Sequence, residues 1–215
     1  MKTYFYEKTG MYIDWEQIKS LPKIDTFIDI GVGSIGTEDL YNNFPEAKLI
    51  LLDPLDEADN YAKNKLQHRE YSFYKYAVGS KAESKYINIE RDVNRSTLLE
   101  VTNINFEGEP LEKKLIRIDS LDNLLKNESN LGSVGIKIDT EGFELDVIKG
   151  SKETLKKCKF LISETRHNHE SFQNQYKLHQ FIKAMQDENF ILSKIFTAKP
   201  LIADLCFEPI KELDF

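Results

Sequence analysis

The chain has 215 residues, of which 40% are hydrophobic and 30% are charged, and its net charge at pH 7 is −7. This length suits a single domain, expected over residues 1–215, and the hydrophobic fraction is enough for a sizeable core. Proteins that bind nucleic acid usually carry a basic face that neutralises phosphates, and an acidic chain of this kind lacks one. We therefore expect no nucleic acid among its partners.

The two cysteines, Cys158 and Cys206, lie far apart in the sequence. Their spacing matches neither a disulfide framework nor a pair of zinc ligands. The first residues, MKTYFYEKTGMYIDW, lack the apolar run of a signal peptide, and the chain has no stretch of about 18 apolar residues that could span a membrane. These features predict a soluble, cytoplasmic protein with no membrane contact.

Predicted strands and helices alternate in the first third of the chain. Residues 1–22 form a predicted N-terminal helical segment, with Asp14 as its N-cap. Runs at 24–30, 47–52 and 71–78 have the length and composition of strands, and helical patterns lie between them. With right-handed crossovers, this order predicts half of a parallel sheet.

The regular alternation breaks after Gly79. Residues 85–90 and 114–118 look like two strands, separated by a polar loop that contains Asn94 and Ser96. We expect residues 80–118 to form an inserted antiparallel β extension beside the main sheet. Its polar residues between 80 and 110, together with the loop at 167–175, are expected to line the site of the acceptor.

Alternation then resumes and ends in a hairpin. A helix is predicted at 121–125, a strand at 134–138, a helix from Glu144, a strand at 160–163 and an amphipathic helix around 178–185. The last two predicted strands, 190–196 and 201–207, can pair only antiparallel, because a parallel return needs a dozen or more residues. The sequence thus predicts an α/β fold with a doubly wound, mostly parallel sheet, a C-terminal antiparallel hairpin and a small antiparallel extension. This arrangement resembles the class I methyltransferase type of the Rossmann-like fold.

A glycine-rich loop, DIGVGSIG, follows the first main strand. Gly31, Gly33 and Gly36 allow the backbone to turn sharply and to approach a ligand closely. Asp53 ends the second strand, where a carboxylate can accept hydrogen bonds from both ribose hydroxyls of an adenosine. Together with Ala77 and Val78 at the end of the third strand, these residues are the predicted cofactor-binding site.

The same glycine spacing also fits a dinucleotide, and Asp29 helps to choose between the two cofactors. A carboxylate two residues before the first glycine would repel a diphosphate but suits the ammonium and sulfonium of S-adenosylmethionine. The alternative is that Asp29 only forms hydrogen bonds within the loop. A nicotinamide-dependent oxidoreductase is therefore the main competing enzyme class, and a catalytically inactive binding protein on the same fold is the non-enzymatic alternative.

A second motif, GIKIDTEGFELDVIKG, spans Gly135 to Gly150. It resembles the K-I-D-x-E-G-x-E signature of the FkbM-type methyltransferases, and IRIDSLDNLL upstream and FLISET downstream resemble the flanking elements of that family. Two departures are visible: Val32-Gly33-Ser34 stands where these families often have alanine and asparagine, and Leu52-Asp53-Pro54 replaces a usual F-E-P. The resemblance implies an S-adenosylmethionine-dependent enzyme that methylates a hydroxyl of a sugar, glycan or polyketide-like small molecule.

Acidic side chains follow the two strands after the extension. Asp139 and Glu141 follow the fourth main strand, and Glu164 and His167 follow the fifth, so topology brings them to one edge of the sheet. We predict that these four residues include the general base. The alternatives are that Glu141 and Glu144 cap the helix that begins there, and that Lys137 forms an ion pair with one of the acids.

A metal ion is a secondary hypothesis at this edge. Asp139 and Glu164 could supply oxygen ligands to a divalent cation such as Mg²⁺, which would lower the pKa of the acceptor hydroxyl. His167 and His169 form an H-x-H pair that more often belongs to a solvated loop. A divalent cation is therefore not expected to be required.

Overall fold

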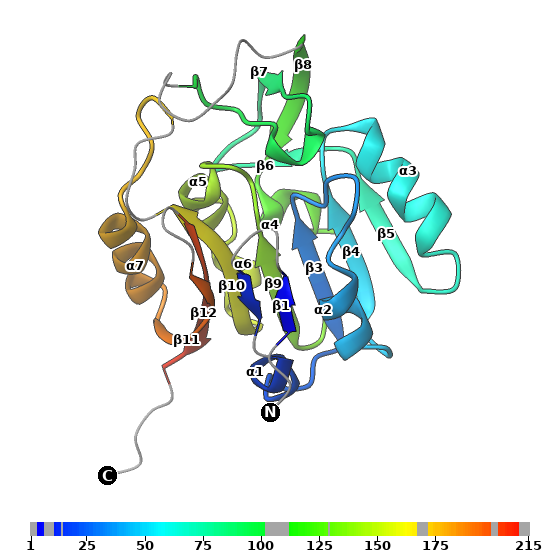
Figure 1. Ribbon diagram of the computed structural model, residues 1–215, viewed down its shortest axis with the longest axis vertical. Helices are drawn as coiled ribbons and strands as arrows, with labels where there is room; N and C mark the ends of the chain where they lie inside the picture. The colour runs from blue at the N-terminus through cyan, green and yellow to red at the C-terminus, as the bar shows by residue number, and fades with distance from the viewer. Residues whose placement is uncertain are drawn as a thin grey trace.

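A seven-stranded sheet runs through the centre of the protein, with helices on both of its faces (Figure 1). The computed structural model describes residues 4–6, 11–13, 15–101, 112–128, 130–166, 172–198 and 202–210. The strands lie in the order β11-β12-β10-β9-β3-β4-β5. Their bounds are β3 Thr26–Ile30, β4 Lys48–Leu52, β5 Tyr71–Tyr74, β9 Val134–Ile138, β10 Cys158–Arg166, β11 Phe190–Ala198 and β12 Ile202–Pro209.

The sheet is mostly parallel. Strands β5, β4, β3, β9 and β10 pair in parallel, whereas β12 inserts between β10 and β11 and is antiparallel to both. The predicted α/β fold with a C-terminal antiparallel hairpin is thus confirmed. The strand order reverses between β3 and β9, and this switch point creates a crevice at the carboxyl ends of the strands.

The two faces of the sheet bury different apolar sets because side chains alternate along each strand. Phe27, Leu49 and Leu51 pack on one face with helices α1 (Trp15–Lys19), α2 (Glu38–Asn43) and α3 (Asp56–Lys65). Ile28 and Ile50 pack on the other face with α4 (Leu121–Leu124), α5 (Glu144–Lys149), α6 (Lys152–Leu155) and α7 (Leu178–Asp187). Each fully buried Leu, Ile or Phe stabilises the fold by about 1.5–3 kcal/mol, so this double-sided core fixes the strand ends that build the site.

The expected extension is a separate three-stranded sheet of order β6-β8-β7. Strands β7 (Glu83–Ile89) and β8 (Glu112–Asp119) pair antiparallel, and β6 (Ala77–Val78) pairs in parallel with β8. The predicted strand 71–78 is therefore wrong as a single element. It divides at residues 75–76, because Tyr71–Tyr74 pairs with β4 while the next two strand residues find their partner in β8.

The N-terminal segment is helical over only part of its predicted length. Residues 15–19 form α1, but Tyr4–Tyr6 (β1) and Met11–Ile13 (β2) pair as antiparallel strands. The aromatic and β-branched residues of both stretches favour extended backbone, which explains the difference from the helical prediction for residues 1–22. The predicted N-cap Asp14 lies outside the described residues.

The helices of the described part of the chain are short. None of them combines the length and the apolar character that crossing a membrane would require.

Candidate active site

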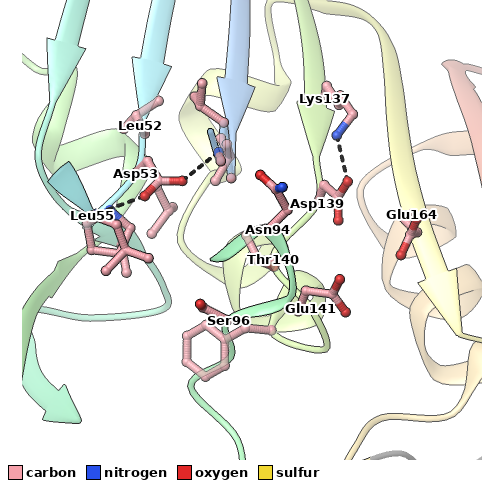
Figure 2. A pocket seen from close by; sticks show the side chains of 18 of the residues that line it. Leu52, Asp53, Leu55, Asn94, Ser96, Lys137, Asp139, Thr140, Glu141 and Glu164 are labelled. Atoms are coloured by element: carbon pink, nitrogen blue, oxygen red, sulfur yellow. Dashed lines mark hydrogen bonds and ion pairs between the residues drawn. The ribbon is translucent and has the colours of Figure 1, made fainter. Parts of the chain in front are cut away.

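A cavity of about 290 Å³ lies at the carboxyl edge of the main sheet. Part of its lining comes from residues that follow strand β7 of the small sheet, namely Val93, Asn94, Ser96 and Leu98. Figure 2 shows Asp53 on one side of this cavity and Asp139, Glu141 and Glu164 on the other. The predicted cofactor-binding and catalytic residues that line it are Gly31, Gly33, Gly36, Asp53, Ala77, Val78, Asp139, Glu141 and Glu164. The crevice expected at the switch point of the sheet thus brings these residues together.

The glycine loop needs its glycines for two separate reasons. Gly31 and Gly33 have φ values of 87° and 61°, a region that favours glycine. A Cβ atom on Gly31 would lie 1.8 Å from the carbonyl oxygen of Asp139, and one on Gly33 would lie 2.3 Å from Asn94 Oδ1. The loop is therefore turned sharply and is also packed closely against Asp139 and Asn94.

Asp53 both shapes the glycine loop and reaches the cavity. Its Oδ2 accepts a hydrogen bond from the Gly33 amide at 3.0 Å, and its Oδ1 accepts one from the Leu55 amide at 2.8 Å. Each carboxylate oxygen has a further lone pair, so the group can still accept hydrogen bonds from a ligand. Burial raises the pKa of Asp53 to about 6, although the two amide donors oppose that shift.

Asp29 lies behind the glycine loop and is not among the described residues that line the cavity. It is fully buried, and its Oδ2 accepts hydrogen bonds from the Tyr41 hydroxyl and, at 3.0 Å, from Thr37 Oγ1. Its Oδ1 has no hydrogen-bond partner within the described part of the chain, and burial raises its pKa. Thr37 does line the cavity, so its hydroxyl stands between Asp29 and the cavity.

Three carboxylates meet on the opposite wall. One carboxylate oxygen from each of Asp139, Glu141 and Glu164 lies within 4.8 Å of the others. Lys137, at the end of β9, donates to Asp139 Oδ2 at 3.0 Å, which realises the ion pair considered from the sequence. Burial opposes the positive charge of Lys137, but nearby carboxylates, with Asp139 the strongest of them, outweigh that effect and raise its pKa.

Neighbouring side chains hold the carboxylate of Glu141 in place. Its carboxylate forms an ion pair with the Arg166 guanidinium, and only 10% of its side chain is exposed. Arg166 also stacks on the Phe172 ring, with 4.9 Å between the guanidinium carbon and the ring centroid. Burial raises the pKa of Glu141 against the opposing effect of Arg166.

Glu144 has a structural role in the turn that precedes helix α5, rather than the helix-capping role considered from the sequence. Its Oε1 accepts hydrogen bonds from the Thr140 amide at 3.0 Å, the Thr140 hydroxyl at 3.1 Å and the Gly142 amide at 2.9 Å. This carboxylate therefore ties down the turn that presents Asp139 and Glu141.

Glu164 differs from its two acidic neighbours. Within the described residues no hydrogen bond to its side-chain carboxylate is present, and burial followed by the charges of Asp139, Glu141 and Asp204 raises its pKa. A carboxyl group of this kind can hold or accept a proton near neutral pH. His167, the fourth predicted catalytic residue, and His169 lie outside the described residues.

The same three acids could hold a hard cation through oxygen ligands. However, Lys137 and Arg166 already supply positive charge to two of them. A resident divalent cation would have to compete with both side chains.

Sequence reasoning missed several residues of the cavity wall. Asp204, on β12, lines the cavity opposite Glu164, its direct partner across the two antiparallel strands. By contrast, the sequence placed Asn94 and Ser96 in the polar stretch expected to line the acceptor site, and both line the cavity. A further apolar portion of the wall comes from Ile87, Val93, Leu98 and Phe143.

Comparisons with known proteins identify a family for the chain. The model of the methyltransferase FkbM domain matches residues 35–192. A crystal structure of methyltransferase FkbM from Methylobacillus flagellatus KT matches with a TM-score of 0.53 at 14% identity, covering 86% of this chain and 43% of that chain. This chain therefore spans less than half of that protein, and the likeness shows a shared fold.

Two more distant structures match along most of this chain. The magnesium protoporphyrin IX methyltransferase from Synechocystis PCC 6803, solved with bound SAM, has a TM-score of 0.47 at 11% identity, covering 91% of this chain and 74% of that chain. The precorrin-6y C5,15-methyltransferase from Geobacter metallireducens GS-15 has a TM-score of 0.47 at 10% identity, covering 90% and 86%. None of the curated protein sequences compared with the chain matches it.

The family match covers most of the chain, including part of the glycine loop, the Gly135–Gly150 motif and Glu164. The chain belongs to the FkbM methyltransferase domain family.

Proposed function

We propose that the chain is an S-adenosylmethionine-dependent O-methyltransferase that acts on a hydroxyl of a small molecule, of the sugar, glycan or polyketide-like class. The observation that carries this proposal is the charge of the cavity. Five carboxylates line it, from Asp53, Asp139, Glu141, Glu164 and Asp204, together with the ammonium of Lys137. Such a wall favours a cation and repels a diphosphate, which argues for S-adenosylmethionine over a nicotinamide dinucleotide.

The residues at the glycine loop fit this cofactor. Asp53 has free lone pairs for the two ribose hydroxyls, while its amide partners hold the carboxylate in place. Thr37 lines the cavity, and the Asp29 carboxylate lies directly behind its hydroxyl. This arrangement suits the ammonium end of the cofactor. The glycines let the backbone approach the nucleoside, and Ala77 and Val78 supply small apolar contacts beside it.

The bound cofactor would supply an electrophilic methyl group on a sulfonium. The part played by this chain is to hold the acceptor oxygen in line with that group, an effect worth up to about 7–11 kcal/mol in ideal cases. A hydroxyl is a weak acid, so a carboxylate within reach would also take its proton during attack, contributing roughly 10²–10⁴-fold. We assign this role to the cluster of Asp139, Glu141 and Glu164. Because Arg166 and Lys137 engage the other two, Glu164 is the member best placed to change its protonation state.

Thermal shift measurements test the cofactor assignment. S-adenosylhomocysteine should raise the melting temperature of the protein, whereas NAD should leave it unchanged, because a ligand stabilises only the folded state that binds it. Stabilisation by NAD alone would indicate an oxidoreductase. Stabilisation by neither ligand would favour a binding protein that has kept the fold without the cofactor.

A screen of hydroxylated acceptors with labelled S-adenosylmethionine tests the reaction itself. Transfer of label to a sugar, glycan or polyketide hydroxyl is the expected result. Transfer only to nitrogen or carbon nucleophiles would contradict the O-methylation proposal while leaving the cofactor assignment intact.

A further inference from the structure

A short segment from the small sheet crosses the cavity and contacts both of its walls. We name residues 92–98 the strap. The strap follows β7 and folds back on it, so that Asn88 and Thr97 exchange backbone hydrogen bonds of 2.8 and 3.0 Å. Four of its residues line the cavity: Val93, Asn94, Ser96 and Leu98. Figure 2 shows Asn94 and Ser96 between the wall that carries Asp53 and the wall that carries Asp139 and Glu141.

One end of the strap holds the glycine loop. Asn94 Oδ1 accepts hydrogen bonds from the Ser34 amide at 2.7 Å and from Ser34 Oγ at 3.1 Å. The orientation of this side chain is fixed, because Asn94 Nδ2 donates to Asp92 Oδ1 at 2.8 Å. Gly33, the neighbour of Ser34, donates its amide to Asp53 on the opposite side. The glycine loop is thus held between Asp53 and Asn94.

The other end of the strap holds the acidic turn. Thr97 is fully buried, and its Oγ1 donates a hydrogen bond to the Glu141 carbonyl at 2.7 Å. Glu141 has a φ of 49°, a left-handed conformation that residues other than glycine rarely adopt. Arg166 fixes the carboxylate of Glu141 from β10, while Thr97 fixes its backbone from the strap.

We propose that Asn94 and Thr97 are positioning residues, through which one strap sets the two walls of the cavity separately. Asn94 acts on the cofactor wall through Ser34, and Thr97 acts on the acidic wall through Glu141. This inference rests on the proposed function, since it assigns the cofactor to the first wall and the acceptor to the second. Each hydrogen bond joins the strap to a different wall, so the two residues have separable effects.

Two readouts that need no acceptor separate these effects. The first is the dissociation constant of S-adenosylhomocysteine, measured by calorimetric titration. The second is deuterium uptake of the peptide that contains residues 139–144, measured by mass spectrometry. Asn94→Ala should weaken S-adenosylhomocysteine binding about tenfold, because the loop that receives the nucleoside loses two hydrogen bonds. It should leave uptake in the acidic turn unchanged.

Thr97→Val has the same shape as the natural residue but no hydroxyl. This variant should increase deuterium uptake in residues 139–144 and change the dissociation constant by less than about twofold. Thr97→Ser restores the hydroxyl and should restore the uptake of the natural protein. Glu100→Ala, which removes an exposed ion pair with Lys113 beyond the strap, is the matched control and should change neither readout.

Three results would overturn the inference. Unchanged S-adenosylhomocysteine affinity in Asn94→Ala would remove the first contact, and equal uptake in Thr97→Ser and Thr97→Val would remove the second. If Asn94→Ala and Thr97→Val each weakened S-adenosylhomocysteine binding and increased deuterium uptake to the same extent, the strap would serve only general stability. Absence of S-adenosylhomocysteine binding by the natural protein would instead contradict the proposed function, and the comparison of the two Thr97 variants would still decide whether the hydroxyl holds the acidic turn.

Discussion

Glu164 and Asp204 stand directly opposite each other on β10 and β12, and both line the same cavity. Like charges in facing positions of antiparallel strands are unfavourable. After burial, the negative charges of Asp139, Glu141 and Asp204 keep the pKa of Glu164 above its ordinary value. The protein therefore carries a carboxyl group that is more easily kept protonated when the cavity holds no cation.

Asp204→Asn should lower the pKa of Glu164 by removing one of these charges. A carboxyl whose pKa is higher in the folded than in the unfolded protein costs stability as pH rises from the unfolded-state pKa to the folded-state pKa. This variant should therefore be more stable than the natural protein across that range, by on the order of 1 kcal/mol. Melting temperatures at pH 5 and pH 9 measure the gain. Asp187→Asn, which breaks an exposed pair with Lys183, serves as the control. A constant difference between Asp204→Asn and the natural protein at both pH values would show that the two carboxyls do not interact.

Asp53→Ala should weaken S-adenosylhomocysteine binding by roughly 10- to 100-fold, since it removes the hydrogen-bond acceptors proposed for the ribose. It also leaves the Gly33 and Leu55 amides without their carboxylate partner, at a cost of about 1–3 kcal/mol of stability. Calorimetric titration measures the affinity, and circular dichroism confirms that the variant is folded. Asp59→Ala, which removes an ion pair with Lys63 on α3 at a position outside the described cavity lining, is the matched control. Natural affinity in Asp53→Ala would refute the ribose role.

Substitutions in the acid cluster should lower turnover more than cofactor affinity. The three variants to compare are Asp139→Asn, Glu141→Gln and Glu164→Gln. The one that removes the general base should turn over an acceptor from the screen roughly 10²–10⁴-fold more slowly than the natural protein. Glu141→Gln additionally weakens the ion pair with Arg166. Steady-state rates, compared with S-adenosylhomocysteine dissociation constants, separate the two effects. If all three variants turned over at the natural rate, the proton acceptor would lie elsewhere, with His167 the next candidate.

Removal of divalent cations should leave methyl transfer unchanged. Lys137 and Arg166 already neutralise part of the charge that a metal ion would otherwise balance at Asp139 and Glu141. Rates measured in excess chelator, and again after adding Mg²⁺, test this expectation. A loss of activity in chelator that Mg²⁺ restores would place a metal ion among the three carboxylates.

The glycine loop and the acids at the ends of β9 and β10 were predictable because topology alone decides their location. Parallel strands end at one edge of a sheet, so Asp53, Asp139 and Glu164 were assigned to the same crevice before any side chain was placed. Their meeting in one cavity follows from strand order.

The remaining features depend on contacts that no local pattern encodes. Asp204 enters the site because β12 inserts between β10 and β11, and the register that sets it against Glu164 is a property of the assembled sheet. Asn94 was expected in the polar stretch near the acceptor, but its hydrogen bond from Ser34 in the glycine loop could not be predicted from the sequence. Asp29 was expected beside the cofactor, but the hydroxyls of Thr37 and Tyr41 hold it behind the loop.

The division of one predicted strand into β5 and β6 limits where the acceptor preference of such a protein can be changed. Ala77 and Val78 pair with β8, so the base of the extension forms part of the cavity lining and is joined to the framework at both ends. Excising residues 80–118 would strip these two residues of their partner and open the nucleoside side of the crevice. Changes to the acceptor preference should therefore leave β6 and β8 in place, and between Glu90 and Leu99 they should keep Asn94 and Thr97, which hold the two walls of the cavity.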